Sequence, residues 1–293
     1  MNQFVQLVVD GLAMGSIYAA LALALVLIFR STGVVNLAQG ELAMFSTFLA
    51  WSLVQAGLPL WLALVATAVG SFAGGMAVER ILIRPVEGRD PLTMLVIALG
   101  MYVLVNAAAG WIWGFETHAF PRVLPAGDTD VGGLRVAYES IGTVAVLLAV
   151  VGLLFLLFQR TKIGLGMRAV AATPESSRLV GISVGRTLML GWGLAAVMGA
   201  IAGVLTAPQL FLEPNMMASV LVYAVAAATL GGFDSPKGAV IGGWTIGVTE
   251  RLAGDYLPFI GSDLTILVPL AVISLVLLVR PQGLFGSPEV VRT

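Results

Sequence analysis

The chain has 293 residues, of which 59% are hydrophobic and only 11% are charged, and its mean hydropathy is +1.00. Because a soluble domain carries about 25% charged residues, this composition argues against a soluble protein and predicts one embedded in lipid. The formal net charge is −1 without a basic block, which argues against a nucleic-acid partner. The chain has no cysteine and a single histidine, His118, which excludes disulfides, thiolate chemistry and multi-histidine metal sites.

Long apolar segments follow one another along the whole chain and predict a bundle of membrane-spanning helices. A spanning helix needs about 20 mostly apolar residues, and the second and seventh segments are short enough to be broken or re-entrant. We therefore expect an all-α integral membrane protein, a polytopic helix bundle of eight to nine spans, with residues 1–293 forming one transmembrane domain. The predicted segments are residues 4–29, 41–56, 60–80, 92–114, 138–159, 186–207, 217–233, 237–254 and 263–279.

The distribution of Lys and Arg predicts the orientation of these spans. Basic residues gather in the loop after the third segment, in the loop 160–186 and in the C-terminal tail, whereas the loops around 115–137 and 208–216 carry few. Because basic loops stay on the cytoplasmic side, we expect a multi-pass protein of the bacterial inner membrane, with the N-terminus outside and the C-terminus in the cytoplasm. Met1–Leu7 has no Lys or Arg, so the first segment is expected to be a retained helix rather than a cleaved signal peptide.

Many of the 35 glycines lie four residues apart inside the apolar segments. Such a pair leaves a flat strip on which another helix can pack closely, either within one bundle or at a subunit interface. The pairs are Gly11/Gly15, Gly70/Gly74, Gly199/Gly203, Gly238/Gly242 and Gly243/Gly247.

Several kinds of chemistry are missing from the sequence. No phosphate-binding loop is present, so the chain itself is not expected to hydrolyse ATP. The stretch 181–185 matches the Gly-x-Ser-x-Gly pattern of hydrolases, but it lies in a basic loop, and His118 is expected to be an exposed residue of another loop. No chain of carboxylates or histidines crosses the apolar segments, which argues against an ion-coupled relay. We expect neither catalytic residues nor a cofactor or metal site in this chain.

The polar segment 160–186 contains the signals of a short helix. Pro174 suits the first turn with Thr173 as N-cap, Glu175 suits the helix dipole, and Gly181 is a typical C-terminal breaker. The helix is expected over about Pro174–Val180, on the cytoplasmic face. The residues alone allow an ordinary interfacial loop helix or a docking element for a cytoplasmic partner.

A second polar segment, Asn36–Glu41, interrupts the apolar pattern before the second span. Its side chains Asn36, Gln39 and Glu41 lie at or near membrane depth, where irregular polar backbone is tolerated if it is buried or lines a cavity. We predict that these three residues face a translocation path. The alternative is that they cap the second helix at the membrane surface.

Together these segments resemble the branched-chain amino-acid ABC transporter permease family, in particular the H-type subunit of its H/M permease pair. Gln39 stands where the family more often has His, and Ser177 where a small Ala is frequent. The matching stretches are Gly11–Ala22 (GLAMGSIYAALA), Gly33–Glu41 (GVVNLAQGE), Glu79–Pro85 (ERILIRP), Arg168–Ile182, Gly231–Gly243 (GGFDSPKGAVIGG) and Arg280–Gly286 (RPQGLFG).

The resemblance implies a permease subunit of an ATP-driven importer. Its expected partners are a homologous second permease subunit, two cytoplasmic ATPase subunits that carry ATP, a periplasmic substrate-binding protein and membrane lipid. The cargo would be a branched-chain amino acid or a related small solute, a description that also covers urea, amides and aromatic acids. The alternative is a secondary transporter or channel for small neutral solutes. The helix in loop 160–186 would be the coupling element, with its ATPase contact formed by Pro174, Glu175, Arg178, Leu179 and Gly181.

Overall fold

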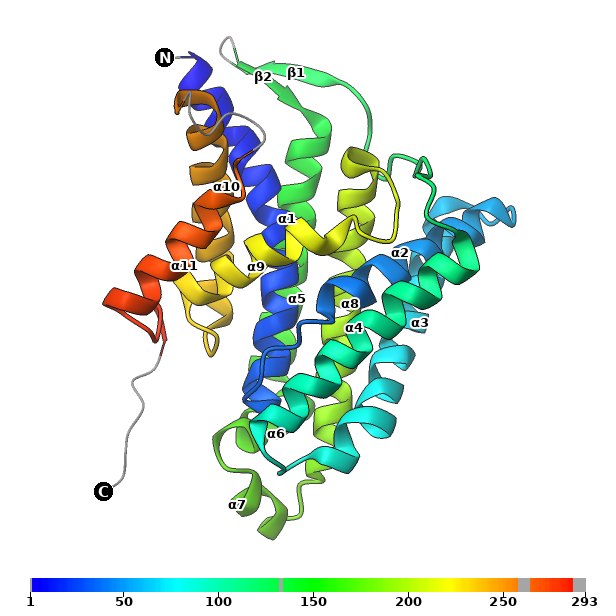
Figure 1. Ribbon diagram of the computed structural model, residues 1–293, viewed down its shortest axis with the longest axis vertical. Helices are drawn as coiled ribbons and strands as arrows, with labels where there is room; N and C mark the ends of the chain where they lie inside the picture. The colour runs from blue at the N-terminus through cyan, green and yellow to red at the C-terminus, as the bar shows by residue number, and fades with distance from the viewer. Residues whose placement is uncertain (1, 132–133, 258–263, 287–293) are drawn as a thin grey trace. The chain divides into compact units, whose positions relative to one another are not determined.

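The computed structural model describes residues 2–131, 134–257 and 264–286. Helices dominate it, which confirms the predicted all-α membrane class (Figure 1). The helices are α1 (Asn2–Thr32), α2 (Gln39–Gln55), α3 (Leu60–Val78), α4 (Pro91–Trp113), α5 (Tyr138–Arg160), α6 (Lys162–Ala172), α7 (Pro174–Leu179), α8 (Val184–Leu210), α9 (Met217–Gly231), α10 (Pro236–Tyr256) and α11 (Leu267–Val279). A π-helical turn (Glu79–Ile83) and a 3-10 turn (Arg84–Val86) follow α3.

Each apolar segment predicted from the sequence coincides with a helix of the described chain. Within that part of the chain, 5 helical stretches are long and apolar enough to cross a membrane, while α9 and α11 are shorter apolar helices. The predicted mixture of full-length and short spans is therefore confirmed. The last predicted segment began at residue 263, which lies outside the described residues, and α11 itself begins at Leu267.

Besides the two turns that follow α3, one helix and one hairpin were not expected from the sequence. The first is α6, which follows α5 almost directly, because the Thr161 hydroxyl accepts a hydrogen bond from the Gly164 amide at 3.0 Å. A Cβ atom at Gly164 would overlap the backbone of Leu157 and Phe158, so the tight reversal requires glycine. The second is an antiparallel hairpin of β1 (Asp128–Val131) and β2 (Leu134–Ala137), in which Asp128 pairs with Ala137.

The chain divides into two compact units that are interleaved along the sequence. Unit 1 comprises residues 1–26, 122–145 and 218–293, and unit 2 comprises residues 27–121 and 146–217. Helices α1 and α5 each contribute residues to both units.

Unit 1 is organised by close contacts between glycines of α1 and α10. A Cβ at Gly11 would lie 2.6 Å from the Cα of Val248, and a Cβ at Gly15 would lie 2.6 Å from the carbonyl oxygen of Gly243. Residue numbers rise along α1 as they fall along α10, so the two helices are antiparallel. Their backbones approach so closely only because side chains are absent at these positions.

Unit 2 is built around α8, which packs along α2 and α3 (Figure 1). Gly199 faces Gln39 and Ala43 of α2, and a Cβ at Gly203 would lie 2.8 Å from the Ala43 carbonyl oxygen. The prediction that glycine pairs permit close packing is thus confirmed for this pair. Gly70 and Gly74 differ, because a Cβ at either position would meet no atom of the described chain within 4 Å.

Candidate functional site

The predicted helix of loop 160–186 is present as α7, Pro174–Leu179. Gly181 follows in the left-handed region with φ of 84°, which ends the helix as the sequence predicted. Thr173 occupies the N-cap position, but its side chain forms no cap bond. Instead, its carbonyl oxygen accepts hydrogen bonds from the amide and the hydroxyl of Ser177, at 3.0 and 2.9 Å.

One side of helix α7 packs against the rest of unit 2, and its other side is exposed. Ser177 is its one buried residue, with 3% of its surface exposed, whereas Leu179 and Val180 are 89% and 75% exposed. Pro174 and Glu175 are exposed as well. These two large apolar side chains therefore have no cover from the described chain.

Arg178 forms an ion pair within the chain that the sequence did not reveal. Its Nη2 atom lies 3.7 Å from Oε1 of Glu87, in the segment that follows α3. That segment is tied to the base of α8 by Arg84, which donates to the Gly185 carbonyl at 2.7 Å and pairs with Glu79 at 2.9 Å. The basic loops 80–89 and 160–186 therefore lie together, as the predicted orientation requires.

Asn36 and Gln39 are buried and hydrogen-bonded to neighbouring parts of unit 2. The Asn36 side-chain oxygen accepts from the Ala38 amide at 3.1 Å, and its Nδ2 donates to Gln39 Oε1 at 3.3 Å. Gln39 Nε2 donates in turn to the Ala195 carbonyl of α8 at 2.9 Å. These bonds hold the start of α2 against α8.

Glu41 is also buried, and it bonds to α4 rather than to α8. Its Oε2 accepts from Asn106 Nδ2 at 3.1 Å, and the Tyr102 side chain, one turn before Asn106 on α4, also interacts with it. Asn106 also reaches the Pro214 carbonyl at 3.0 Å. The structure thus brings Asn36 and Gln39 together, whereas Glu41 belongs to a separate polar cluster.

Tyr102 and Asn106 were missed as partners of the polar segment. A signal was present, because they are polar residues four positions apart in an otherwise apolar predicted span, and so lie on one face of the helix. That spacing could have identified a polar face on the predicted span 92–114, but it could not have shown that Glu41 lies against this face.

Two cavities of unit 2 lie along the segment that precedes α2, and one of them is lined by Asn36. The larger, about 230 Å³, is lined by residues that include Val34, Glu87 and Arg89. A smaller cavity of about 20 Å³ is lined by Asn36 and Trp192 among others, and has room for a single water molecule. Asn36 therefore combines a hydrogen bond from the Ala38 amide, just before α2, with a position at a cavity wall. The prediction that the segment faces a translocation path remains a prediction.

His118 corrects one sequence expectation. It is partly buried rather than exposed, and its ring lies 4.6 Å from that of Trp51. Its backbone exchanges two hydrogen bonds of 2.9 Å with Leu212. The residue therefore fixes the loop after α4 to the loop after α8. Among the residues that the structure describes, no group of three His, Asp or Glu is placed to hold a metal ion.

Comparison with known proteins identifies the architecture. The family model described as branched-chain amino acid transport system / permease component matches residues 7–278. This chain belongs to that family. It is 31% identical to the high-affinity branched-chain amino acid transport system permease protein BraD of Pseudomonas aeruginosa, over 98% of this chain and 97% of BraD. The permease protein LivH of the corresponding system in Escherichia coli K12 is also 31% identical, with the same coverage.

A solved structure shares the fold at much lower sequence identity. The structure titled PsaBC from Streptococcus pneumoniae in complex with Fab aligns with a TM-score of 0.51 and 13% identity. The alignment covers 95% of this chain and 92% of that chain. Together with the apolar helices, the family establishes a multi-pass permease subunit of the bacterial inner membrane.

Proposed function

We propose that this chain is the permease subunit through which an ATP-driven importer moves branched-chain amino acids or closely related small solutes across the inner membrane. The observation that carries the proposal is the family match over residues 7–278, supported by relatives that align over nearly their full length. The permease pairs with a second, homologous permease chain and receives its cargo from a periplasmic binding protein.

The energy for transport comes from two ATPase subunits that dock on the coupling helices of the permease pair, and α7 is the coupling helix of this chain. The sequence offers no phosphate-binding loop of its own. Helix α7 presents Leu179 and Val180 to its surroundings beside the charged side chains of Glu175 and Arg178. An apolar centre with a charged rim is the usual composition of a protein–protein contact. This surface supports the predicted contact of Pro174, Glu175, Arg178, Leu179 and Gly181 with the ATPase.

The cargo is a small neutral or zwitterionic solute. The polar groups predicted for the path are mainly amides, and the carboxylate of Glu41 is already hydrogen-bonded to Asn106. Groups of this kind bind an ion weakly, which suits release into the cytoplasm. Selectivity among leucine, urea and aromatic acids then depends mainly on the periplasmic binding protein.

The test is uptake by the reconstituted importer. The chain is co-expressed with its second permease and ATPase subunits, placed in liposomes, and supplied with labelled leucine and the binding protein. Uptake that requires ATP and the ATPase subunits is expected. Leucine uptake by the permease chains alone would instead indicate a secondary transporter or channel. A binding protein that takes only a sugar or a metal ion would contradict the substrate class.

A further inference from the structure

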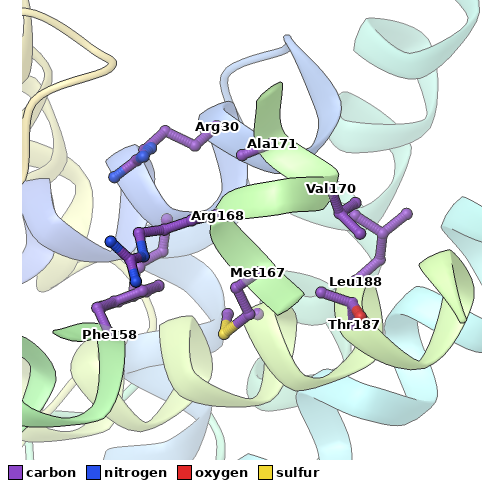
Figure 2. A pocket seen from close by; sticks show the side chains of 10 residues that line it. Arg30, Phe158, Met167, Arg168, Val170, Ala171, Thr187 and Leu188 are labelled. Carbon is purple, nitrogen blue, oxygen red and sulfur yellow. The ribbon is translucent and has the colours of Figure 1, made fainter. Parts of the chain in front are cut away.

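An open pocket lies where α1, α5, α6 and α8 meet in unit 2 (Figure 2). Its walls are apolar except for Arg30, Arg168 and Thr187. The enclosed part measures about 30 Å³, which is enough space for about two water molecules. A ligand would therefore insert one small group and leave the rest of its body outside.

Two positively charged guanidinium groups at this pocket favour the binding of an anion. Arg30 comes from the last turn of α1 and Arg168 from α6, and both extend toward the same side of the pocket, with Phe158 below Arg168 (Figure 2). Arg168 Nε is buried and has no hydrogen-bond partner among the described residues. Its Nη1 makes one long contact, 3.4 Å, to Gln159. The planar guanidinium group of Arg168, with one buried N–H that has no acceptor, is suited to donate hydrogen bonds to phosphate oxygens.

The pocket also lies at the level where spans leave the membrane. Candidate spans end at Arg30 and at Arg160, and α6 begins two residues after Arg160. Helix α6 is amphipathic, with Ile163 and Leu165 largely exposed beside basic residues. Such a helix lies in the interface between lipid headgroups and acyl chains. A ligand that enters the pocket from the α6 side would keep its apolar part in the bilayer.

We propose that Arg30 and Arg168 bind the phosphate group of an anionic phospholipid in the leaflet on the side of the basic loops. The phosphate accepts from the two guanidinium groups, and the acyl chains remain in the bilayer. Basic pockets between spans on the cytoplasmic side bind anionic headgroups in this manner. A free phosphate ion offers the same oxygens to the arginines without an acyl anchor, and it is the alternative source that the experiment must separate.

The bound lipid would hold α6 in place and, through it, α7. Val170 of α6 is packed in a small buried cluster with Val184 and Leu188 of α8, and α7 follows α6 after a single residue. The proposal rests on this geometry and not on the identity of the transported solute, so lipid binding is measured without any transport assay.

The experiment uses the assembled transporter, purified in detergent and titrated with phosphatidylglycerol, and counts bound lipids by native mass spectrometry. The variants are Arg168→Gln and the pair Arg30→Gln/Arg168→Gln. The control is Arg186→Gln, an exposed basic residue of the same loop that does not line the pocket. A basic residue near an anionic surface contributes about 1 kcal/mol. We therefore expect phosphatidylglycerol affinity to fall about five-fold for the single variant and about 30-fold for the pair, with the control unchanged.

Two further titrations identify the ligand class. Phosphatidylcholine, whose phosphate charge is offset by its choline cation, should bind the wild type more weakly than phosphatidylglycerol and should lose less affinity in the variants. Inorganic phosphate should not displace bound phosphatidylglycerol. If Arg168→Gln retains wild-type affinity for phosphatidylglycerol, or if the control loses as much affinity as the variants, the lipid does not bind at this pocket. Equal binding of inorganic phosphate with no lipid preference would make this a free-anion site and overturn the lipid assignment. Arg168→Gln alone decides the question if the pair fails to assemble.

Discussion

Arg178 has one partner within the chain and one proposed outside it. We predict that Arg178→Glu lowers ATP-driven uptake several-fold while the amount of chain in the membrane stays at the wild-type level. Its ion pair with Glu87 is 3.7 Å long, and the two side chains are 63% and 31% exposed; solvent-exposed pairs contribute only about 0.2–1 kcal/mol. The loss of uptake would therefore come from the ATPase contact and not from unfolding. Uptake and ATP hydrolysis are measured on the same reconstituted samples.

The charge-exchanged variant Glu87→Arg/Arg178→Glu is the matched control for that prediction. It restores the pair within the chain but leaves the reversed charge on the outer face of α7. Uptake should stay low in the double variant if Arg178 contacts the ATPase. Recovery to wild-type uptake would mean that Arg178 acts through Glu87, and it would remove Arg178 from the proposed contact.

Variants of Asn36 and Gln39 can distinguish a role in the translocation path from a role in capping α2. We predict that Asn36→Ala and Gln39→Ala each lower uptake while the assembled complex is retained. Each substitution removes hydrogen bonds worth about 0.5–1.5 kcal/mol apiece, which a folded membrane domain can lose. Uptake is compared with the yield of assembled complex for each variant. Ser52→Ala, which removes the 2.7 Å bond from Trp113 near the other end of α2, is the control. Unchanged uptake in both amide variants would favour a purely capping role.

The partners of these residues could not be predicted from the sequence, although the residues themselves could. Asn36 and Gln39 were identified because polar groups interrupt an apolar pattern. The bond from Gln39 to the Ala195 carbonyl joins positions 156 residues apart and uses a backbone acceptor, which no side-chain pattern reveals. The contact of Glu87 with Arg178 is similar, because loop 160–186 offers several basic residues with which Glu87 could pair.

Among the elements, the long apolar helices were predictable and the short ones were only partly so. Hydropathy and length predicted each spanning segment, and Pro174 and Gly181 predicted the limits of α7 within one residue. Helix α6 was missed because it has only 11 residues and includes Gly164 and Gly166, which disfavour helices. The hairpin was missed although the sequence has Gly-Gly at 132–133, a dipeptide that is typical of hairpin turns.

The glycine strips give a prediction at the scale of elements. Gly203→Val should destabilise the chain by about 1–3 kcal/mol, the usual cost of overpacking, because the new Cβ meets Thr47 and the Ala43 carbonyl. Gly70→Val, also within a helix, should be tolerated because its Cβ meets no described atom within 4 Å. Thermal unfolding of the purified single chain measures both variants. Equal destabilisation would show that helix propensity, and not the contact between α2 and α8, sets the requirement for glycine.

At the scale of the whole molecule, the basic residues and the proposed partners point to the same side of the membrane. The loop that carries α7, the segment with Glu87 and the lipid pocket at Arg168 all belong to unit 2. An ATPase and an anionic leaflet both lie on the cytoplasmic side of a bacterial membrane. The predicted orientation, with the N-terminus outside, is therefore a condition for the docking contact and for the lipid site alike.

The orientation can be measured directly because the chain has no cysteine of its own. Two exposed residues serve as reporters, Ala126 before the hairpin and Ser176 in α7. We predict that a membrane-impermeant maleimide added to intact spheroplasts labels Ala126→Cys but not Ser176→Cys, and that permeabilisation makes Ser176→Cys reactive. The wild-type chain, which has no thiol, is the blank, and uptake confirms that each variant is assembled. Labelling of Ser176→Cys in sealed spheroplasts would place α7 outside and would contradict the ATPase contact, because ATP and the ATPase subunits are cytoplasmic.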